Sequence, residues 1–238
     1  RLDEFRQRLL TMHDNFFAVL CHEFNTPLNG MIGFASVLKE ELEDKERGRM
    51  AGFIEDTAKD LHDTFMEILD YINSKAPGDH LESETFTLQD LAQKLDASRY
   101  SAKVTYELVG DFWKSGDCFV GPLYSLSAIL VNSVLAGVPG NDMPVQIFGS
   151  FTDGKITFRL TNLDLESRFG TPDDLDAIFS PYTTSRAARR RFDPGVGLHL
   201  ATSRNLADTE GIRLEARKND DGCIDIYITT ELLKVESF

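Results

Sequence analysis

The sequence predicts an antiparallel helical hairpin, which dimerisation would complete as a four-helix bundle, followed by an α+β sandwich. Three observations lead to this fold class. Two long stretches at the start carry apolar residues at helical spacing, a cluster of helix breakers at residues 76–79 follows them, and the rest of the chain mixes short helices with strands. We therefore assign the hairpin to residues 1–78 and the sandwich to residues 79–238.

The hairpin is predicted from the spacing of its apolar residues. A first helix extends from Leu2 to about Glu43, and its apolar residues recur at the spacing of one helix face. After a short charged turn, a second helix carries its apolar stripe from Met50 to Ile72. A short connection makes the two helices antiparallel neighbours. Because one hairpin cannot bury both stripes, we expect it to dimerise as a four-helix bundle.

The sandwich is predicted from short elements beyond the breaker cluster Ala76-Pro77-Gly78-Asp79. Two pairs of strands are each joined by an Asp-Gly dipeptide, which favours a tight hairpin turn. The expected helices are 86–95, 123–135 and 198–207, and the expected strands are 103–109, 145–151, 155–161, 213–218 and 223–230.

The composition describes a folded, acidic protein. The formal net charge of -14 repels phosphate backbones and anionic lipids, so we expect no nucleic-acid partner and no binding to a membrane surface. No apolar run is long enough to cross a bilayer, so we expect membrane attachment only through segments outside this chain. Cys21, Cys118 and Cys223 are widely spaced and odd in number, which favours a reducing cytoplasm.

The most informative segment surrounds His22. This imidazole lies on an apolar helical pattern, with Glu23 directly after it and the polar pair Asn25-Thr26 about one turn further on. A neutral histidine is a competent nucleophile, and an adjacent carboxylate can hydrogen-bond the ring or remove its proton. Side chains one helical turn apart reach the same space. A lone histidine would more often be a packing residue, but that explanation gives no reason for Glu23 and Thr26.

The run His22-Glu23-Phe24-Asn25-Thr26-Pro27-Leu28 resembles the H-box of sensor histidine kinases. This resemblance implies that His22 accepts the phosphoryl group and that Glu23 serves autophosphorylation. It also implies that Asn25 and Thr26 help to position the water that dephosphorylates a partner receiver domain. A Bergerat-type ATP-binding sandwich is the domain that follows the hairpin in this family, with ATP and Mg²⁺ as its cofactors.

The segment 121–133 resembles the stretch that leads into the family's N-box. It places Asn132 on the asparagine that binds Mg²⁺. The earlier asparagine of the box is replaced by Ala128, and the lysine near the phosphates is replaced by Leu135. Losing a cation and a polar group there weakens the binding of a triphosphate.

The segment 160–166 occupies the place of the G1-box. Asn162 stands where an aspartate normally accepts a hydrogen bond from the adenine amino group, and an Asn carbonyl can still accept one. Asp164 and Glu166 replace the glycines of the box. Two carboxylates beside a nucleotide, without glycines for a close backbone approach, argue against ordinary nucleotide binding.

The segment 175–182 resembles the F-box, and Gly195 and Gly197 resemble part of the G2-box, which implies contacts to the nucleotide. His199 stands where a third glycine is usual. With no motif of its own, His199 is expected to be a solvated or packing residue.

Together these features predict a regulatory kinase core with poor or no autokinase activity, in which ATP and Mg²⁺ bind weakly or not at all. It would act on a partner sensor kinase by direct bundle contact, by receiver dephosphorylation, or by both. We expect a homodimer or a heterodimer with another sensor histidine kinase, in the cytoplasmic portion of a bacterial sensor anchored in the inner membrane. The alternatives are an active autokinase with a divergent nucleotide pocket and a phosphotransfer module built on His22.

Overall fold

The computed structural model describes residues 24, 26–38, 44–75, 83–97, 106–137, 144–165, 175–181 and 197–235. The chain divides into two compact units, and along the sequence the division falls between Leu69 and Asp70. Residues 76–82, which include the predicted boundary at 78/79, lie outside the described residues, so that boundary stays a prediction.

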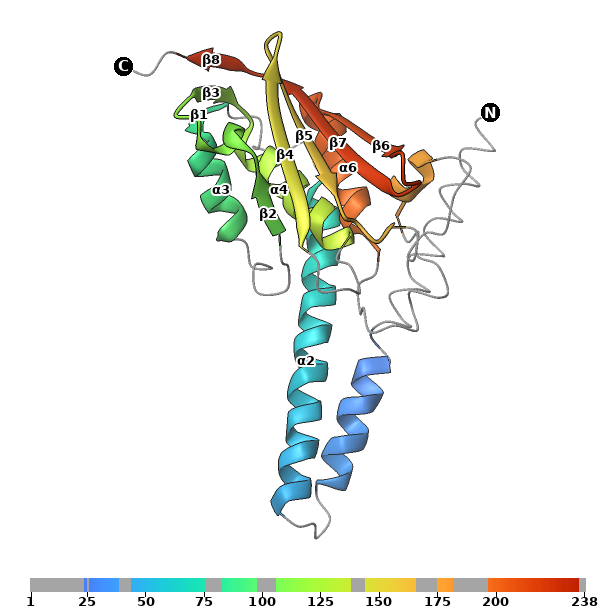
Figure 1. Ribbon diagram of the computed structural model, residues 1–238. Helices are drawn as coiled ribbons and strands as arrows, with labels where there is room; N and C mark the ends of the chain where they lie inside the picture. The colour runs from blue at the N-terminus through green and yellow to red at the C-terminus, as the bar shows by residue number, and fades with distance from the viewer. Residues whose placement is uncertain are drawn as a thin grey trace. The chain divides into compact units, whose positions relative to one another are not determined.

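Two antiparallel helices form the described part of the first unit (Figure 1). One covers residues 26–37, and the other is α2, Asp44–Asn73. Two aromatic pairs join them, with ring centroids 5.0 and 6.5 Å apart: Phe34 with Phe53, and Phe24 with Phe65. Later residues of the first helix contact earlier residues of the second, which confirms the predicted antiparallel hairpin. The predicted part of the first helix before residue 24 lies outside the described residues.

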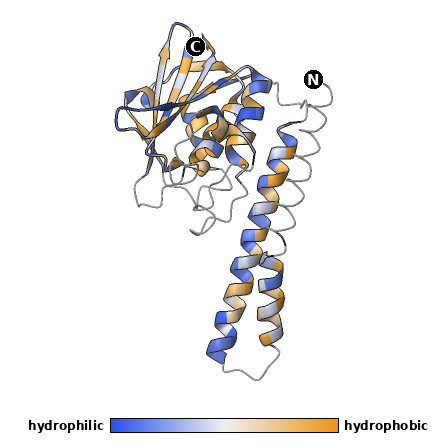
Figure 2. Ribbon diagram, turned by 90° about the vertical axis from the view of Figure 1, so that its right-hand side faces the viewer, coloured by the Kyte–Doolittle hydropathy of each residue, from blue (hydrophilic) through white to orange (hydrophobic). Residues whose placement is uncertain are grey.

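Large apolar side chains stay exposed on both helices of the hairpin. Ile32 is 62% exposed and Phe53 is 50% exposed, and Leu28 and Phe65 are exposed as well. Figure 2 shows hydrophobic residues along these helices. Apolar surface of this kind is stabilised when other helices cover it. Among the described residues, no helix has the length and apolar character needed to span a membrane.

The second unit contains two sheets with helices packed against them, which confirms the predicted α+β class (Figure 1). In the larger sheet β2 pairs with β4 in parallel, and all other pairs are antiparallel. Its strands, in spatial order, are β2 (Tyr106–Val109), β4 (Val145–Thr152), β5 (Lys155–Thr161), β7 (Ile224–Glu231) and β6 (Arg213–Lys218). The smaller, antiparallel sheet consists of β1 (Glu84–Thr87), β3 (Cys118–Gly121) and β8 (Leu233–Val235).

The helices of this unit are α3 (Leu88–Asp96), α4 (Leu123–Ala136) and α6 (His199–Glu210), with short 3-10 helices η2 (Asp111–Lys114) and η3 (Leu175–Phe179). The core lies where these helices pack on the larger sheet. Phe158 on β5 is fully buried and stacks on Trp113 of η2, with ring centroids 5.4 Å apart. The indole Nε1 of Trp113 donates to the carbonyl of Ile147 at 3.0 Å, so the polar end of this buried ring has a partner.

Most predicted elements are confirmed, including α4 and both hairpins. The β4–β5 turn places Asp153 at φ +53° and Gly154 at φ +76°, as a tight turn of primed type requires. The predicted helix 86–95 was wrong at its start, because Phe86 belongs to β1. The helix begins at Leu88, because Thr87 and Asp90 form a reciprocal capping box. The strands β1, β3 and β8 were not predicted.

Candidate nucleotide and phosphotransfer site

Four residues of the hairpin were predicted to serve phosphotransfer: His22, Glu23, Asn25 and Thr26. His22, Glu23 and Asn25 lie outside the described residues, so their geometry stays a prediction. Thr26 is described and lies exposed on the helix 26–37. A threonine hydroxyl can both donate and accept hydrogen bonds, and exposure on the helix surface makes this side chain reachable by a docking partner.

Asn132, the predicted Mg²⁺ ligand, lies on α4 and is only 7% exposed. Its Nδ2 donates to the carbonyl of Ala128 at 2.9 Å, and its Oδ1 lies 3.0 Å from Nδ1 of His199. Because a carboxamide oxygen can only accept, this contact requires the hydrogen of the imidazole to be on Nδ1. His199 was expected to be a solvated or packing residue. It is a hydrogen-bond partner of Asn132, a role that the sequence did not indicate.

The contact between Asn132 and His199 is one of three polar contacts between α4 and α6, which together we call the seam. Two further contacts join the same helices: Ser203 Oγ donates to the carbonyl of Ile129 at 3.3 Å, and Ser125 Oγ donates to Glu210 Oε1 at 2.9 Å. The α4 residues descend in number as the α6 residues ascend, so the two helices pack antiparallel. Because the three contacts lie at successive positions along both helices, the seam fixes the register of one helix against the other.

Asn162, the predicted adenine contact, lies at the end of β5 with φ at +59°. Its side chain is exposed, and Nδ2 lies 3.4 Å from the carbonyl of Pro144. Asparagine tolerates this left-handed backbone conformation better than most residues. The inward-facing residues of β5 alternate as Ile156, Phe158 and Leu160, but after Asn162 the buried residues are Leu163 and Leu165. The left-handed conformation of Asn162 thus shifts the pattern of buried residues by one position. Leu163 is buried where continued alternation would have buried residue 162.

Leu163 packs against the end of α4. The amide of Asp164 donates to the carbonyl of Gly137 at 3.1 Å. A Cβ added to Gly137 would lie 2.1 Å from Cδ2 and 2.8 Å from Cβ of Leu163. The absence of a side chain at Gly137 therefore allows Leu163 to fill this space.

Replacing Gly137 by alanine is expected to lower the free energy of unfolding by about 1–3 kcal/mol, because the new methyl group would displace Leu163 from a packed position. Urea denaturation of the two proteins would measure the difference. Gly48→Ala is the matched control, since Gly48 lies within α2 with nothing near its added Cβ. That change should leave stability unchanged or raise it. Equal stability of Gly137→Ala and the wild type would contradict this placement of Leu163.

Of the two predicted G2-box glycines, Gly195 lies outside the described residues and Gly197 stands just before α6. Gly197 has φ at +78°, a conformation that L side chains rarely adopt, so a glycine is needed there. The adjoining α6 begins at His199, which brings the imidazole to the first turn of the helix.

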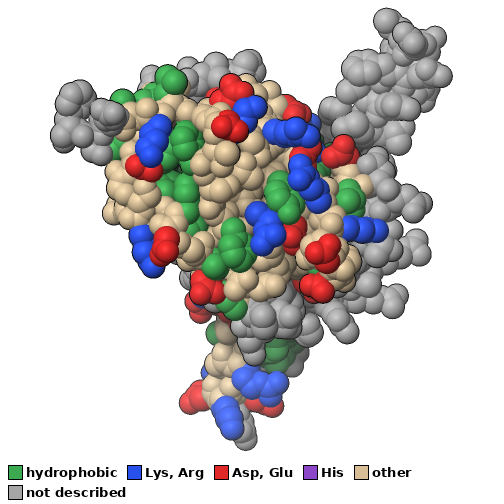
Figure 3. Space-filling model, turned by 45° about the horizontal axis from the view of Figure 1, so that its top comes forward, with side chains coloured by type: hydrophobic (Ala, Val, Ile, Leu, Met, Phe, Trp, Pro, Cys, Tyr) green, Lys and Arg blue, Asp and Glu red, His purple; other side chains and the backbone are tan. Residues whose placement is uncertain are grey.

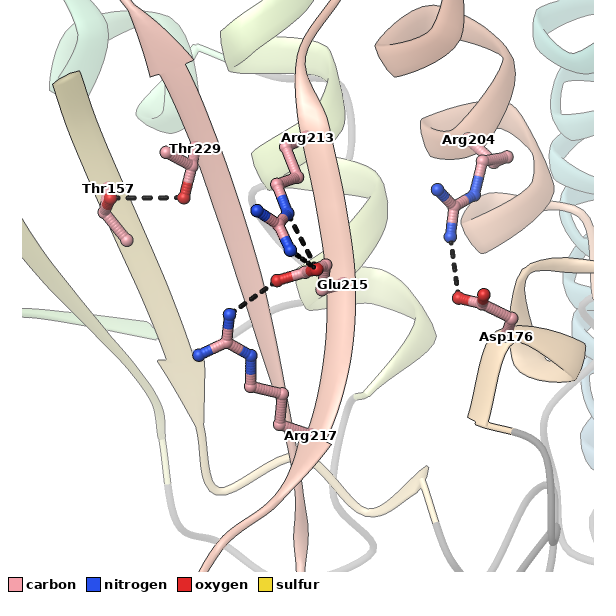
Figure 4. A network of polar contacts seen from close by, with 7 residues as sticks. All are labelled: Thr157, Asp176, Arg204, Arg213, Glu215, Arg217 and Thr229. Carbon is pink, nitrogen blue, oxygen red and sulfur yellow. Dashed lines mark hydrogen bonds and ion pairs between the residues drawn. The ribbon is translucent and has the colours of Figure 1, made fainter.

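The segment that resembles an F-box forms η3 and is held by α6. Nη2 of Arg204 lies 3.2 Å from Oδ1 of Asp176, and its guanidinium lies 4.4 Å from the centroid of the Phe179 ring (Figure 4). Ile178 and Phe179 are buried. The resemblance located this segment, but no sequence signal identified Arg204 as its anchor.

The outer face of the larger sheet carries a separate charged cluster (Figure 4). Arg213 and Arg217 both pair with Glu215, and Arg217 also lies over the ring of Tyr227. The hydrogen bond from Arg217, and then the pairing with Arg213, hold the pKa of the Glu215 carboxyl below its usual value. On the face shown in Figure 3, basic side chains lie beside acidic ones rather than in one basic patch. In the described ranges, no group of three or more His, Cys, Asp or Glu is arranged to hold a metal ion.

Comparison with known proteins gives one family-model match: residues 12–76 match the His Kinase A (phospho-acceptor) domain. The chain is 28% identical over 206 residues to the sensor histidine kinase GacS of Pseudomonas protegens, which covers 82% of this chain and 22% of GacS. It is 23% identical over 206 residues to the autoinducer 2 sensor kinase/phosphatase LuxQ of Vibrio parahaemolyticus, covering 82% of this chain and 23% of LuxQ. The chain therefore spans less than a quarter of the length of these relatives.

Two solved histidine kinases share the fold. Histidine kinase ThkA in complex with the response regulator protein TrrA matches with a TM-score of 0.63 at 16% identity, over 95% of this chain and 64% of that chain. Full-length ShkA in complex with AMPPNP matches with a TM-score of 0.56 at 19% identity, over 94% of this chain and 47% of that chain. The chain thus combines a His Kinase A (phospho-acceptor) domain with a sheet domain of histidine-kinase fold, and it is a relative of the sensor histidine kinases.

Proposed function

We propose that this chain is the cytoplasmic kinase core of a membrane-anchored hybrid two-component sensor with poor or no autokinase activity. It regulates a partner sensor kinase by direct contact between helical bundles, by dephosphorylating a receiver domain, or by both. It does so as a homodimer or as a heterodimer with that kinase. ATP and Mg²⁺ bind weakly or not at all.

The observation that carries the proposal is the conformation at the end of β5. The resemblance places the adenine contact at position 162, the residue that would come next in the inward alternation of Ile156, Phe158 and Leu160. The left-handed backbone of Asn162 instead leaves its side chain exposed, and Leu163 fills the inward position against Gly137. This arrangement supports weak or absent nucleotide binding, and we derive no phosphoryl transfer from ATP through these residues.

Receiver dephosphorylation needs none of these residues. In that reaction water attacks the phosphorus of a phospho-aspartate, the bond from phosphorus to the carboxylate oxygen breaks, and aspartate and inorganic phosphate are released. A positioned hydroxyl aids the attack by holding the water in line. The exposed Thr26 supports this role, and His22 and Glu23 belong to the same matched domain. The name of LuxQ as a kinase/phosphatase and the complex of ThkA with a response regulator support a receiver as the partner.

The test is calorimetric titration of the chain with ATP and Mg²⁺, with Asn132→Ala as the control. We expect no detectable binding at micromolar concentrations for either protein. Micromolar binding by the wild type that Asn132→Ala abolishes would contradict the proposal and would favour an active autokinase with a divergent pocket.

A further inference from the structure

We propose that His199 is a specificity-determining residue that prevents a divalent cation from binding to Asn132. It does so by holding the Asn132 side chain in a hydrogen bond between α4 and α6. The inference deepens the proposed function and rests on it, because it names the residue that closes the metal position. The juxtaposition that carries it is the 3.0 Å contact between Nδ1 of His199 and Oδ1 of Asn132.

Both polar groups of Asn132 are already engaged within the protein. The Nδ2 group donates to Ala128 one turn earlier, and this bond fixes which end of the carboxamide faces α6. Oδ1, the atom that a cation would use, accepts from the ring of His199. Asn132 is 7% exposed, so water cannot readily replace either partner. Removing the partner of a buried acceptor leaves that acceptor without a hydrogen bond, which is unfavourable and therefore favours keeping the contact.

A cation and the imidazole compete for the same oxygen. Mg²⁺ binds oxygen ligands at about 2.0–2.1 Å and demands a nearly ideal octahedral shell. An N–H group directed at Oδ1 uses one of the two lone pairs of this oxygen and places the positive end of its dipole beside the other, so it repels a cation approaching that oxygen.

The packing around the contact between His199 and Asn132 also makes this contact hard to break. Ser203 and Ser125 join the same two helices further along the seam, so α6 cannot shift by itself without breaking several hydrogen bonds. His199 occupies the first turn of α6, two residues after the left-handed Gly197, which helps to fix where that turn begins. The imidazole is thus held by the backbone on one side and by Asn132 on the other.

The test compares His199→Ala with His199→Asn in the whole 238-residue chain, using AMPPNP with Mg²⁺ as the calorimetric probe. Alanine removes the donor, whereas the Nδ2 of an asparagine lies close to the place of Nδ1 and can still donate to Asn132. We expect His199→Ala to bind the probe at least about tenfold more tightly than the wild type, a change of about 1.4 kcal/mol. His199→Asn is expected to behave as the wild type does.

The possible outcomes separate this inference from the proposed function. If neither the wild type nor His199→Ala binds the probe, the inference is wrong and the proposed function stands. If the two proteins bind the probe equally but only weakly, the inference is again wrong and the proposed function stands. If the wild type binds it at micromolar concentrations and as tightly as His199→Ala, both are wrong. A second measurement needs no variant: the nitrogen chemical shifts of the His199 ring in the wild type report which nitrogen carries the hydrogen. A hydrogen on Nδ1 supports the inference, and a ring protonated only on Nε2 overturns it.

Discussion

Replacing Phe158 by alanine is expected to lower the free energy of unfolding of the sheet domain by about 3–5 kcal/mol, the cost of removing a buried aromatic ring and leaving a cavity. Phe158 is fully buried, and it stacks on Trp113 at 5.4 Å with the two rings inclined by 27°. It also meets the edge of Phe112, with ring centroids 6.3 Å apart. The surrounding strands and η2 hold these partners in place, so they cannot close the cavity.

Urea denaturation followed by tryptophan fluorescence would measure this loss. Trp113 is the chain's one tryptophan and contacts Phe158 directly, so its signal reports on this domain rather than on the hairpin. The matched control is Phe158→Leu, which keeps most of the volume and should lose less than about 1.5 kcal/mol. A loss below about 1 kcal/mol for Phe158→Ala would mean that the ring does not fill the core as described, because even modest cavities cost more.

The longer elements of the fold could be predicted because each carries its own periodic signal. The helix α4 is almost continuously apolar, and both long hairpins of the larger sheet are marked by Asp-Gly turns. The strands β1, β3 and β8 have only three or four residues each, too few to show an alternating pattern. Phe86 is an apolar residue just before α3, so it looks like part of the apolar pattern of that helix. Only the capping role of Thr87 shows that the helix begins after it.

The candidate site was less predictable, because its contacts depend on packing between distant segments. Asn132 and His199 are 67 positions apart, and nothing in either motif indicates that α4 and α6 bring them together. The turn at Asn162 did leave a signal. The apolar residues of β5 occupy alternate positions up to Leu160. Continued alternation would place the next one at position 162, but the next apolar residue is Leu163, and this break indicates a special backbone conformation between them.

Replacing Thr26 by alanine is expected to slow the dephosphorylation of a receiver domain by about 100-fold, because a reacting water that is no longer held in line loses a factor of this size. Thr26→Ser keeps the hydroxyl and should retain most of the rate. A purified receiver domain phosphorylated with acetyl phosphate provides the substrate, and the decay of its acyl phosphate in the presence of the 238-residue chain gives the rate. Since Thr26 is exposed, neither change is expected to unfold the hairpin.

The outcomes of this experiment distinguish three modes of action. Equal rates for the wild type and Thr26→Ala would contradict a phosphatase role for Thr26. If His22→Ala and Thr26→Ala both kept their effect on a partner kinase, contact between the bundles alone would explain the regulation, since the exposed apolar stripe of the hairpin is intact in both variants. Acid-labile phosphate appearing on His22 without ATP would instead indicate that the imidazole takes the phosphoryl group from the receiver, because a phosphohistidine, unlike a product of hydrolysis, retains that group on the protein.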